Sequence, residues 1–143
     1  PTFAPDGNQI AFTSDRAGKP QIYSVAATGG DATRVSFSGE YNARATLGHQ
    51  GKTLAMAQGS GNVYRIAVLD RSRGGAGEMR LISPGNLDES PSFAPNGSMI
   101  LYAAREGKRG VLFAISADGR VRQRLVLADG DVREPAWGPF RQR

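Results

Sequence analysis

The chain opens with Pro1-Thr2-Phe3-Ala4-Pro5-Asp6-Gly7-Asn8-Gln9-Ile10-Ala11-Phe12, and a close copy returns at Pro91-Ser92-Phe93-Ala94-Pro95-Asn96-Gly97-Ser98-Met99-Ile100-Leu101-Tyr102. A weaker copy spans residues 45–56, and a fourth begins at Pro135-Ala136-Trp137-Gly138-Pro139. The large apolar residue of each copy recurs after 44, 46 and 44 residues, at Phe3, Leu47, Phe93 and Trp137. A β-rich repeat of about 40–50 residues is typical of propeller blades.

Each copy predicts a β-hairpin. In Ala4-Pro5-Asp6-Gly7 the proline presets φ and the glycine accepts a left-handed backbone, so this segment is predicted to turn. Ile10 and Phe12 then alternate with Ala11, as in a strand with one apolar face. The second copy has His49-Gln50 in place of the Pro-Asp pair, which weakens the turn prediction there but leaves Gly51 in place.

Ten strands are predicted from this alternation, in addition to the short inner strands that begin the later repeats. They fall at 1–4, 9–14, 21–25, 33–37, 52–57, 63–70, 79–83, 98–104, 111–116 and 122–127. Turns are predicted between them at 59–62, 74–77 and 117–119, and no segment has sustained helical periodicity. A single four-stranded sheet cannot bury both of its faces, whereas sheets stacked radially can.

We therefore predict an all-β fold, a β-propeller fragment of about three four-stranded antiparallel blades at approximately 1–41, 42–88 and 89–133. The inner strand of a fourth blade is expected at 134–140. Known propellers have about four to eight blades, so this number of repeats does not close an ordinary ring. We expect either a piece of a larger ring or a chain that completes its ring by self-association.

The composition excludes several classes of protein. The chain has 143 residues and a formal net charge of +5, but its charges are scattered and form no long basic run, so nucleic-acid binding is not expected. It has no cysteine, which excludes disulfides and thiolate metal sites. No apolar run is long enough to span a membrane, and no signal peptide is present in a chain that opens inside a repeat.

Catalytic and metal-binding motifs are also lacking. The single histidine, His49, occupies a predicted turn without a nucleophile motif nearby, and Gly59-Ser60-Gly61 is too short a match to a nucleophile elbow. Asp129-Gly130-Asp131 resembles the start of a calcium loop, but the distal glutamate is missing. We expect no enzyme activity, no cofactor and no metal in these motifs; a cation in an axial channel remains an open alternative.

The most informative polar residues precede each predicted inner strand. Repeat symmetry places them around one opening, and mixed charges around a concave face suit a protein partner. Seven residues are candidates for this partner-binding surface: Asn42, Arg44, Asp88, Glu89, Ser90, Arg133 and Glu134. The alternative is that Glu89 and Glu134 anchor turns, and both roles are compatible with one residue.

The recurring Phe-Ala-Pro-Asp/Asn-Gly pattern resembles the TolB-type propeller repeat. Three longer segments carry the same resemblance: 10–23, 87–97 and 129–140. The resemblance implies a six-bladed propeller that follows a smaller α/β domain, in a protein of the periplasm of Gram-negative bacteria. By that analogy the chain holds the last three blades and lacks the α/β domain.

The resemblance also implies a function. Proteins of this family are noncatalytic scaffolds of the Tol–Pal envelope system: the propeller face binds the lipoprotein Pal, the extreme N-terminus binds TolA, and some colicins use the Pal site. The alternative is the gating propeller of a prolyl-oligopeptidase-like serine peptidase, because such propellers share the repeat. A hydrolase domain elsewhere in the gene would favour the peptidase.

Overall fold

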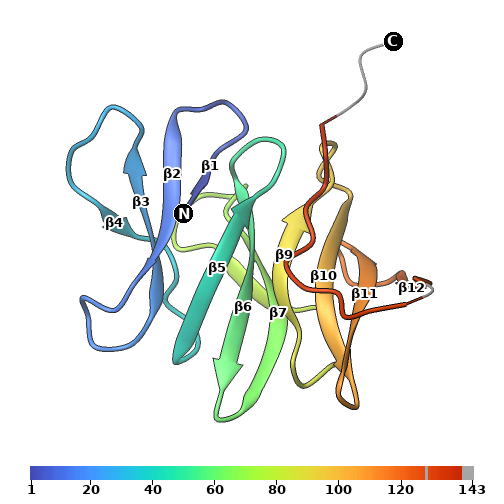
Figure 1. Ribbon diagram of the computed structural model, residues 1–143. Helices are drawn as coiled ribbons and strands as arrows, with labels where there is room; N and C mark the ends of the chain where they lie inside the picture. The colour runs from blue at the N-terminus through green and yellow to red at the C-terminus, as the bar shows by residue number, and fades with distance from the viewer. Residues whose placement is uncertain (128, 140–143) are drawn as a thin grey trace.

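Three four-stranded antiparallel sheets lie side by side in the computed structural model, which describes residues 1–127 and 129–139 (Figure 1). The first sheet contains β1 (Thr2–Phe3), β2 (Gln9–Ser14), β3 (Gln21–Ala26) and β4 (Thr33–Arg34). The second contains β5 (Tyr41–Leu47), β6 (Thr53–Ser60), β7 (Val63–Asp70) and β8 (Glu78–Leu81). The third contains β9 (Glu89–Phe93), β10 (Met99–Glu106), β11 (Arg109–Ser116) and β12 (Arg122–Leu125). The all-β prediction is confirmed.

The described residues include no helix, and therefore none that could cross a membrane. Within each sheet the strands follow chain order from the inner strand to the outer strand, so every connection is a hairpin between neighbours. This up-and-down order makes the strand pairs within each sheet local in sequence.

The turn between the first two strands is the same in all three sheets. Its glycine has a left-handed φ (72° at Gly7, 68° at Gly51 and 73° at Gly97) and donates its N–H to the carbonyl three residues earlier. The His49-Gln50 substitution therefore leaves the turn intact. The glycine, not the Pro-Asp pair before it, is what this backbone geometry requires.

Eight of the ten predicted strands differ from the observed strands by one to three residues at an end, and two of these differences have a clear structural reason. The turn expected at 59–62 is shorter, because Ser60 pairs directly with Val63 and Gly59 lies within β6. The first outer strand ends at Arg34 because the N–H groups of Val35 and Ser36 both donate to the carbonyl of Ile22 and so leave the regular ladder. Residues 134–139 are described without a strand, and residue 140 of that predicted inner strand lies outside the described residues.

The sheets pack through two apolar layers. The first and second sheets bury Ala4, Ala11, Ile22, Val35, Leu47, Leu54, Met56, Ala67 and Leu69 between them. The second and third sheets bury Ala55, Ile66, Val68, Phe93, Ile100, Tyr102, Ala104, Val111, Phe113 and Ile115. Each layer combines small alanines with larger side chains from both sheets, and each fully buried large side chain contributes about 1.5–3 kcal/mol.

The repeated apolar residue of the inner strand is buried in the second and third sheets, each of which packs against a preceding sheet. Leu47 and Phe93 are 7% and 8% exposed, whereas the equivalent Phe3 is 62% exposed. Phe3 shares its face of the first sheet with Ile10, its partner across β1 and β2. Within this chain, the first sheet therefore has an uncovered apolar face.

Candidate functional site

The chain returns to the start of the third strand of each sheet before it enters the next inner strand. Three repeat-equivalent hydrogen bonds fix this return: Asn42 N–H donates to Pro20 O (2.9 Å), Asp88 N–H to Tyr64 O (3.0 Å) and Val132 N–H to Gly110 O (3.2 Å). Because these contacts repeat, the residues that follow them enter each inner strand at the same level.

Two residues after each of these contacts, the backbone adopts a left-handed conformation. The φ angles are 54° at Arg44, 56° at Ser90 and 50° at Glu134, and none of these residues is glycine. The strand register shifts beside the first two positions, between Ala43 and Thr46 in β5 and opposite Leu101–Ala103 in β9. Such positions cost free energy and gather at functional sites.

The three strained residues bring their side chains together. Arg44 Nη1 donates to Ser90 Oγ at 2.8 Å and to Glu134 Oε1 at 3.1 Å. The Arg44–Glu134 ion pair is open to solvent, with side chains 50% and 73% exposed. We call this group the inner-strand triad. It lines a cavity of about 350 Å³ together with Thr2, Thr13, Thr46 and residues adjacent to them.

A second cavity, of about 450 Å³, lies between the second and third sheets. Its apolar lining comes from Tyr41, Ala57, Tyr64 and Leu87. Its charged lining comes from Arg44, Glu89, Arg105 and Arg133. Arg44 therefore borders both cavities, and Glu89 and Arg133, both predicted as site residues, border the second.

Asn42 and Asp88 are placed differently from the other predicted site residues, because both are buried. The Asn42 amide donates to Gln21 Oε1 (2.9 Å) and Ser38 O (2.8 Å) and accepts from Gln58 Nε2 (3.1 Å). These bonds hold the loop that leads into β5. Asn42 thus positions Arg44 and does not itself reach the opening.

The Asp88 carboxylate has the equivalent place before β9. It accepts hydrogen bonds from the Gly85 N–H at 2.9 Å and from the Ser83 hydroxyl. Burial raises the pKa of Asp88 above the usual value for a carboxyl group, although these hydrogen bonds and the nearby Arg122 and Arg65 oppose the rise. Asp88 positions Glu89 and Ser90 in the same way that Asn42 positions Arg44.

Sequence reasoning missed the aromatic part of the second cavity. Tyr41 and Leu87 directly precede the predicted residues Asn42 and Asp88, so repeat alignment could have found them. Tyr64 and Arg105 are brought in by strand pairing from positions that carry no motif. Pairing across a sheet depends on register, which a single strand does not reveal.

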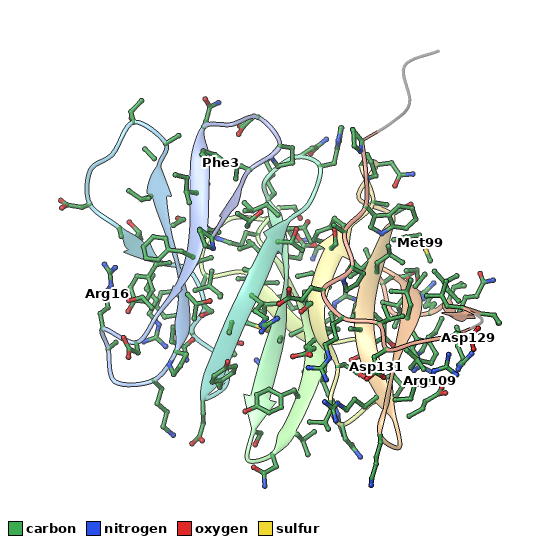
Figure 2. All side chains as sticks on the ribbon, in the orientation of Figure 1. Phe3, Arg16, Met99, Arg109, Asp129 and Asp131 are labelled. Atoms are coloured by element: carbon green, nitrogen blue, oxygen red, sulfur yellow. The ribbon has the colours of Figure 1, made fainter. Side chains whose placement is uncertain are left out.

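The segment that resembled a calcium loop is tied to the start of β11 in the third sheet (Figure 2). Asp131 Oδ1 accepts the Gly110 N–H at 2.8 Å, and Gly130 O accepts from Arg109 Nε at 3.0 Å. Among the described residues, no three His, Cys, Asp or Glu side chains gather as metal ligands. His49 is exposed in its turn.

Four-stranded sheets that pack face to face and present repeat-related side chains at one opening define the blades of a β-propeller. The chain belongs to the TolB β-propeller family, since residues 1–141 match the family described as the TolB beta propeller domain.

Known proteins agree with this assignment. A Tol-Pal system protein TolB of Xanthomonas campestris is 71% identical over 117 residues, which cover 82% of this chain and 26% of that protein. The crystal structure of TolB from Acinetobacter baumannii is similar with a TM-score of 0.86 and 47% identity, over 96% of this chain and 34% of that one. A putative TolB from Agrobacterium tumefaciens has a TM-score of 0.85 at 19% identity over 96% of this chain and 49% of that one, which supports the fold alone.

The chain thus spans about a quarter of the length of the curated relatives it matches. Those relatives are named as Tol-Pal system proteins, so the peptidase alternative is not favoured.

Proposed function

We propose that this chain forms part of a noncatalytic periplasmic propeller of the Tol–Pal system, and that the opening at its inner strands binds the lipoprotein Pal. The observation that carries the proposal is the inner-strand triad, in which side chains from three successive repeats meet although each requires a strained backbone. The names of the relatives supply the system in which this binding surface works.

The chemistry of the opening suits a folded protein partner. Arg44 and Glu134 are more than a third exposed, so their ion pair adds little to stability. Charges of both signs at a solvent-exposed rim instead steer a partner and set its orientation. Four further features are proposed by analogy with the family. They are a complete ring of six repeats, an α/β domain, TolA binding through an N-terminal segment, and use of the Pal site by colicins.

The test is calorimetric titration of soluble Pal into the full-length protein that contains this chain. We expect saturable binding that Arg44→Glu and Glu134→Lys each weaken by at least about tenfold, which corresponds to roughly 1.4 kcal/mol. The matched control for Glu134→Lys is Glu78→Lys on outer strand β8, which makes the same charge change at another exposed site. Absence of binding by the wild-type protein, or equal weakening by the control, would refute the proposal.

A further inference from the structure

The second cavity has an aromatic floor that the backbone fixes in place. The rings of Tyr41 and Tyr64 meet edge to face, with centroids 5.4 Å apart and an interplanar angle of 82°. Gly59 pairs with Tyr41 on one side and Tyr64 on the other. A Cβ atom at Gly59 would lie 2.8 Å from Tyr64 Cε1 and 3.1 Å from Tyr41 Cδ1, so the glycine leaves space for both rings.

Leu87 completes the apolar part of this cavity. It forms a bridge with Tyr64, whose N–H donates to Asn86 O at 2.8 Å, and the Leu87 side chain is 42% exposed. An apolar side chain held beside two tyrosines by backbone hydrogen bonds is preorganised to receive another apolar group. Burying such a group there costs little conformational entropy.

The charged lining is mainly positive, with three arginines and one glutamate. Arg44 is held by Ser90 and Glu134. Arg105 and Arg133 are exposed, and neither forms an ion pair within the described part of the chain. Arginine binds carboxylates through two parallel hydrogen bonds, and arginine and tyrosine are both enriched among the hot-spot residues near the centres of protein interfaces.

We propose that this cavity, the tyrosine pocket, is an anchor site for an acidic segment of the protein partner, with an aromatic or aliphatic side chain on the tyrosines and a carboxylate on Arg105 and Arg133. The inference rests on the proposed function and specifies which chemistry of the partner the opening recognises. The volume of about 450 Å³ accommodates a few side chains. The Glu89 carboxylate in the lining disfavours a phosphodiester chain, because a continuous line of phosphates would pass close to it.

The pocket can be tested with a short probe, independently of Pal. Saturation-transfer NMR on the full-length protein would compare the peptide acetyl-Asp-Phe-Asp-amide with its neutral counterpart acetyl-Asn-Phe-Asn-amide. We expect binding of the acidic peptide and binding of the neutral peptide about fivefold weaker, as one favourable charged contact implies. Arg105→Gln, Arg133→Gln and Leu87→Ser should each weaken the acidic peptide by a similar factor.

The control is Arg80→Gln on outer strand β8, an exposed arginine outside the pocket, which should bind the peptide as the wild type does. Equal binding of the two peptides, or unchanged affinity for the acidic peptide in the three pocket variants, would refute the proposal that the pocket anchors an acidic segment. Stronger binding of a thymidine hexanucleotide than of the acidic peptide would overturn it as well.

Titration of Pal into the same proteins separates the two proposals. If Pal binds the wild type and all pocket variants with the same affinity, the pocket does not anchor the partner, and the proposed function stands. If the acidic peptide binds but Pal does not, the proposed function is wrong and the chemistry of the pocket stands.

Discussion

Nη1 of Arg44 lies 3.1 Å from Oε1 of Glu134, although the two residues are 90 positions apart in the chain. Both side chains project from residues with a left-handed backbone at equivalent places of the repeat. Such a backbone costs a non-glycine residue about 1–2 kcal/mol, whereas an exposed ion pair returns about 0–1 kcal/mol. The contact does not offset its own strain, which supports a role in binding.

Relief of this strain should stabilise the protein. Ser90→Gly removes the left-handed penalty of about 1–2 kcal/mol, adds about 0.5–1 kcal/mol of chain entropy cost and loses the exposed hydrogen bond from Arg44, which contributes about 0.5 kcal/mol, so the free energy of unfolding should rise by up to about 1 kcal/mol. Urea unfolding of the full-length protein measures this change. Ser24→Gly, in the middle of β3 and without a left-handed φ, should lower stability instead, and a decrease for both variants would contradict the strain argument.

Gly110 should not tolerate a side chain. An added Cβ atom would lie 2.4 Å from the carbonyl oxygen of Val132, which is backbone and cannot rotate away. Gly110→Ala should therefore lower stability by about 1–3 kcal/mol and displace the segment that carries Arg133 and Glu134. Gly138→Ala meets no atom within 4 Å and should be nearly neutral. Thermal unfolding midpoints distinguish the two, and equal midpoints would mean that the segment does not pack against β11.

Asp88 should give the protein a distinctive pH dependence. Burial raises the pKa of its carboxyl group in the folded state, so folding favours the protonated form. This contribution is fully present below the unfolded pKa of about 3.9 and is lost as pH rises through the higher folded pKa. Relative to wild type, Asp88→Asn should therefore gain stability between about pH 4 and neutrality.

The free energy of unfolding of wild type and Asp88→Asn, measured across this pH range, checks the prediction. A difference between the two proteins that does not change with pH would contradict it. Asp88→Ala is the companion variant. It leaves the Gly85 N–H and the Ser83 hydroxyl without their acceptor and should be about 1–3 kcal/mol less stable than Asp88→Asn, with the same pH dependence relative to wild type because neither replacement titrates.

The uncovered face of the first sheet should make the 143-residue chain associate when it is expressed alone. Phe3 is 62% exposed there, whereas the equivalent Phe93 is buried against the preceding sheet. Sedimentation equilibrium should show a mass that rises with concentration, and Phe3→Ser should reduce this rise. The control is Val121→Ser, which removes an apolar side chain that is 60% exposed at another place. This variant should leave the rise in mass with concentration unchanged. A wild-type chain that stays monomeric at all concentrations would refute self-association.

The sheets were predictable because their signals are local. The spacing of Phe3, Leu47 and Phe93 indicated the repeat, and the turn glycines fixed where each hairpin reverses. The turn survives at His49-Gln50 for the same reason. Boundaries that depend on distant partners were less predictable. Gly59 reads as a turn residue in sequence, but its pairing with Tyr41 and Tyr64 places it inside β6.

The candidate site was predictable as a location and less so in its parts. Repeat symmetry placed Arg44, Ser90 and Glu134 around one opening, and the structure adds that their side chains contact one another. It could not separate them from Asn42 and Asp88, since a polar residue gives no sign in sequence of being buried and satisfied by loop hydrogen bonds. The tyrosine pocket was missed because residues from five strands and two loops must be in register before it exists.

The most direct test of the central claim, that the opening at the inner strands contacts the partner, is site-specific photo-crosslinking to Pal. A photoreactive residue would replace Arg133 in the lining of the tyrosine pocket or, as control, Glu78 on outer strand β8 of the full-length protein. We predict a crosslinked adduct with Pal from position 133 and none from position 78. An adduct from position 78 alone, or from neither position while Pal still binds, would contradict the account.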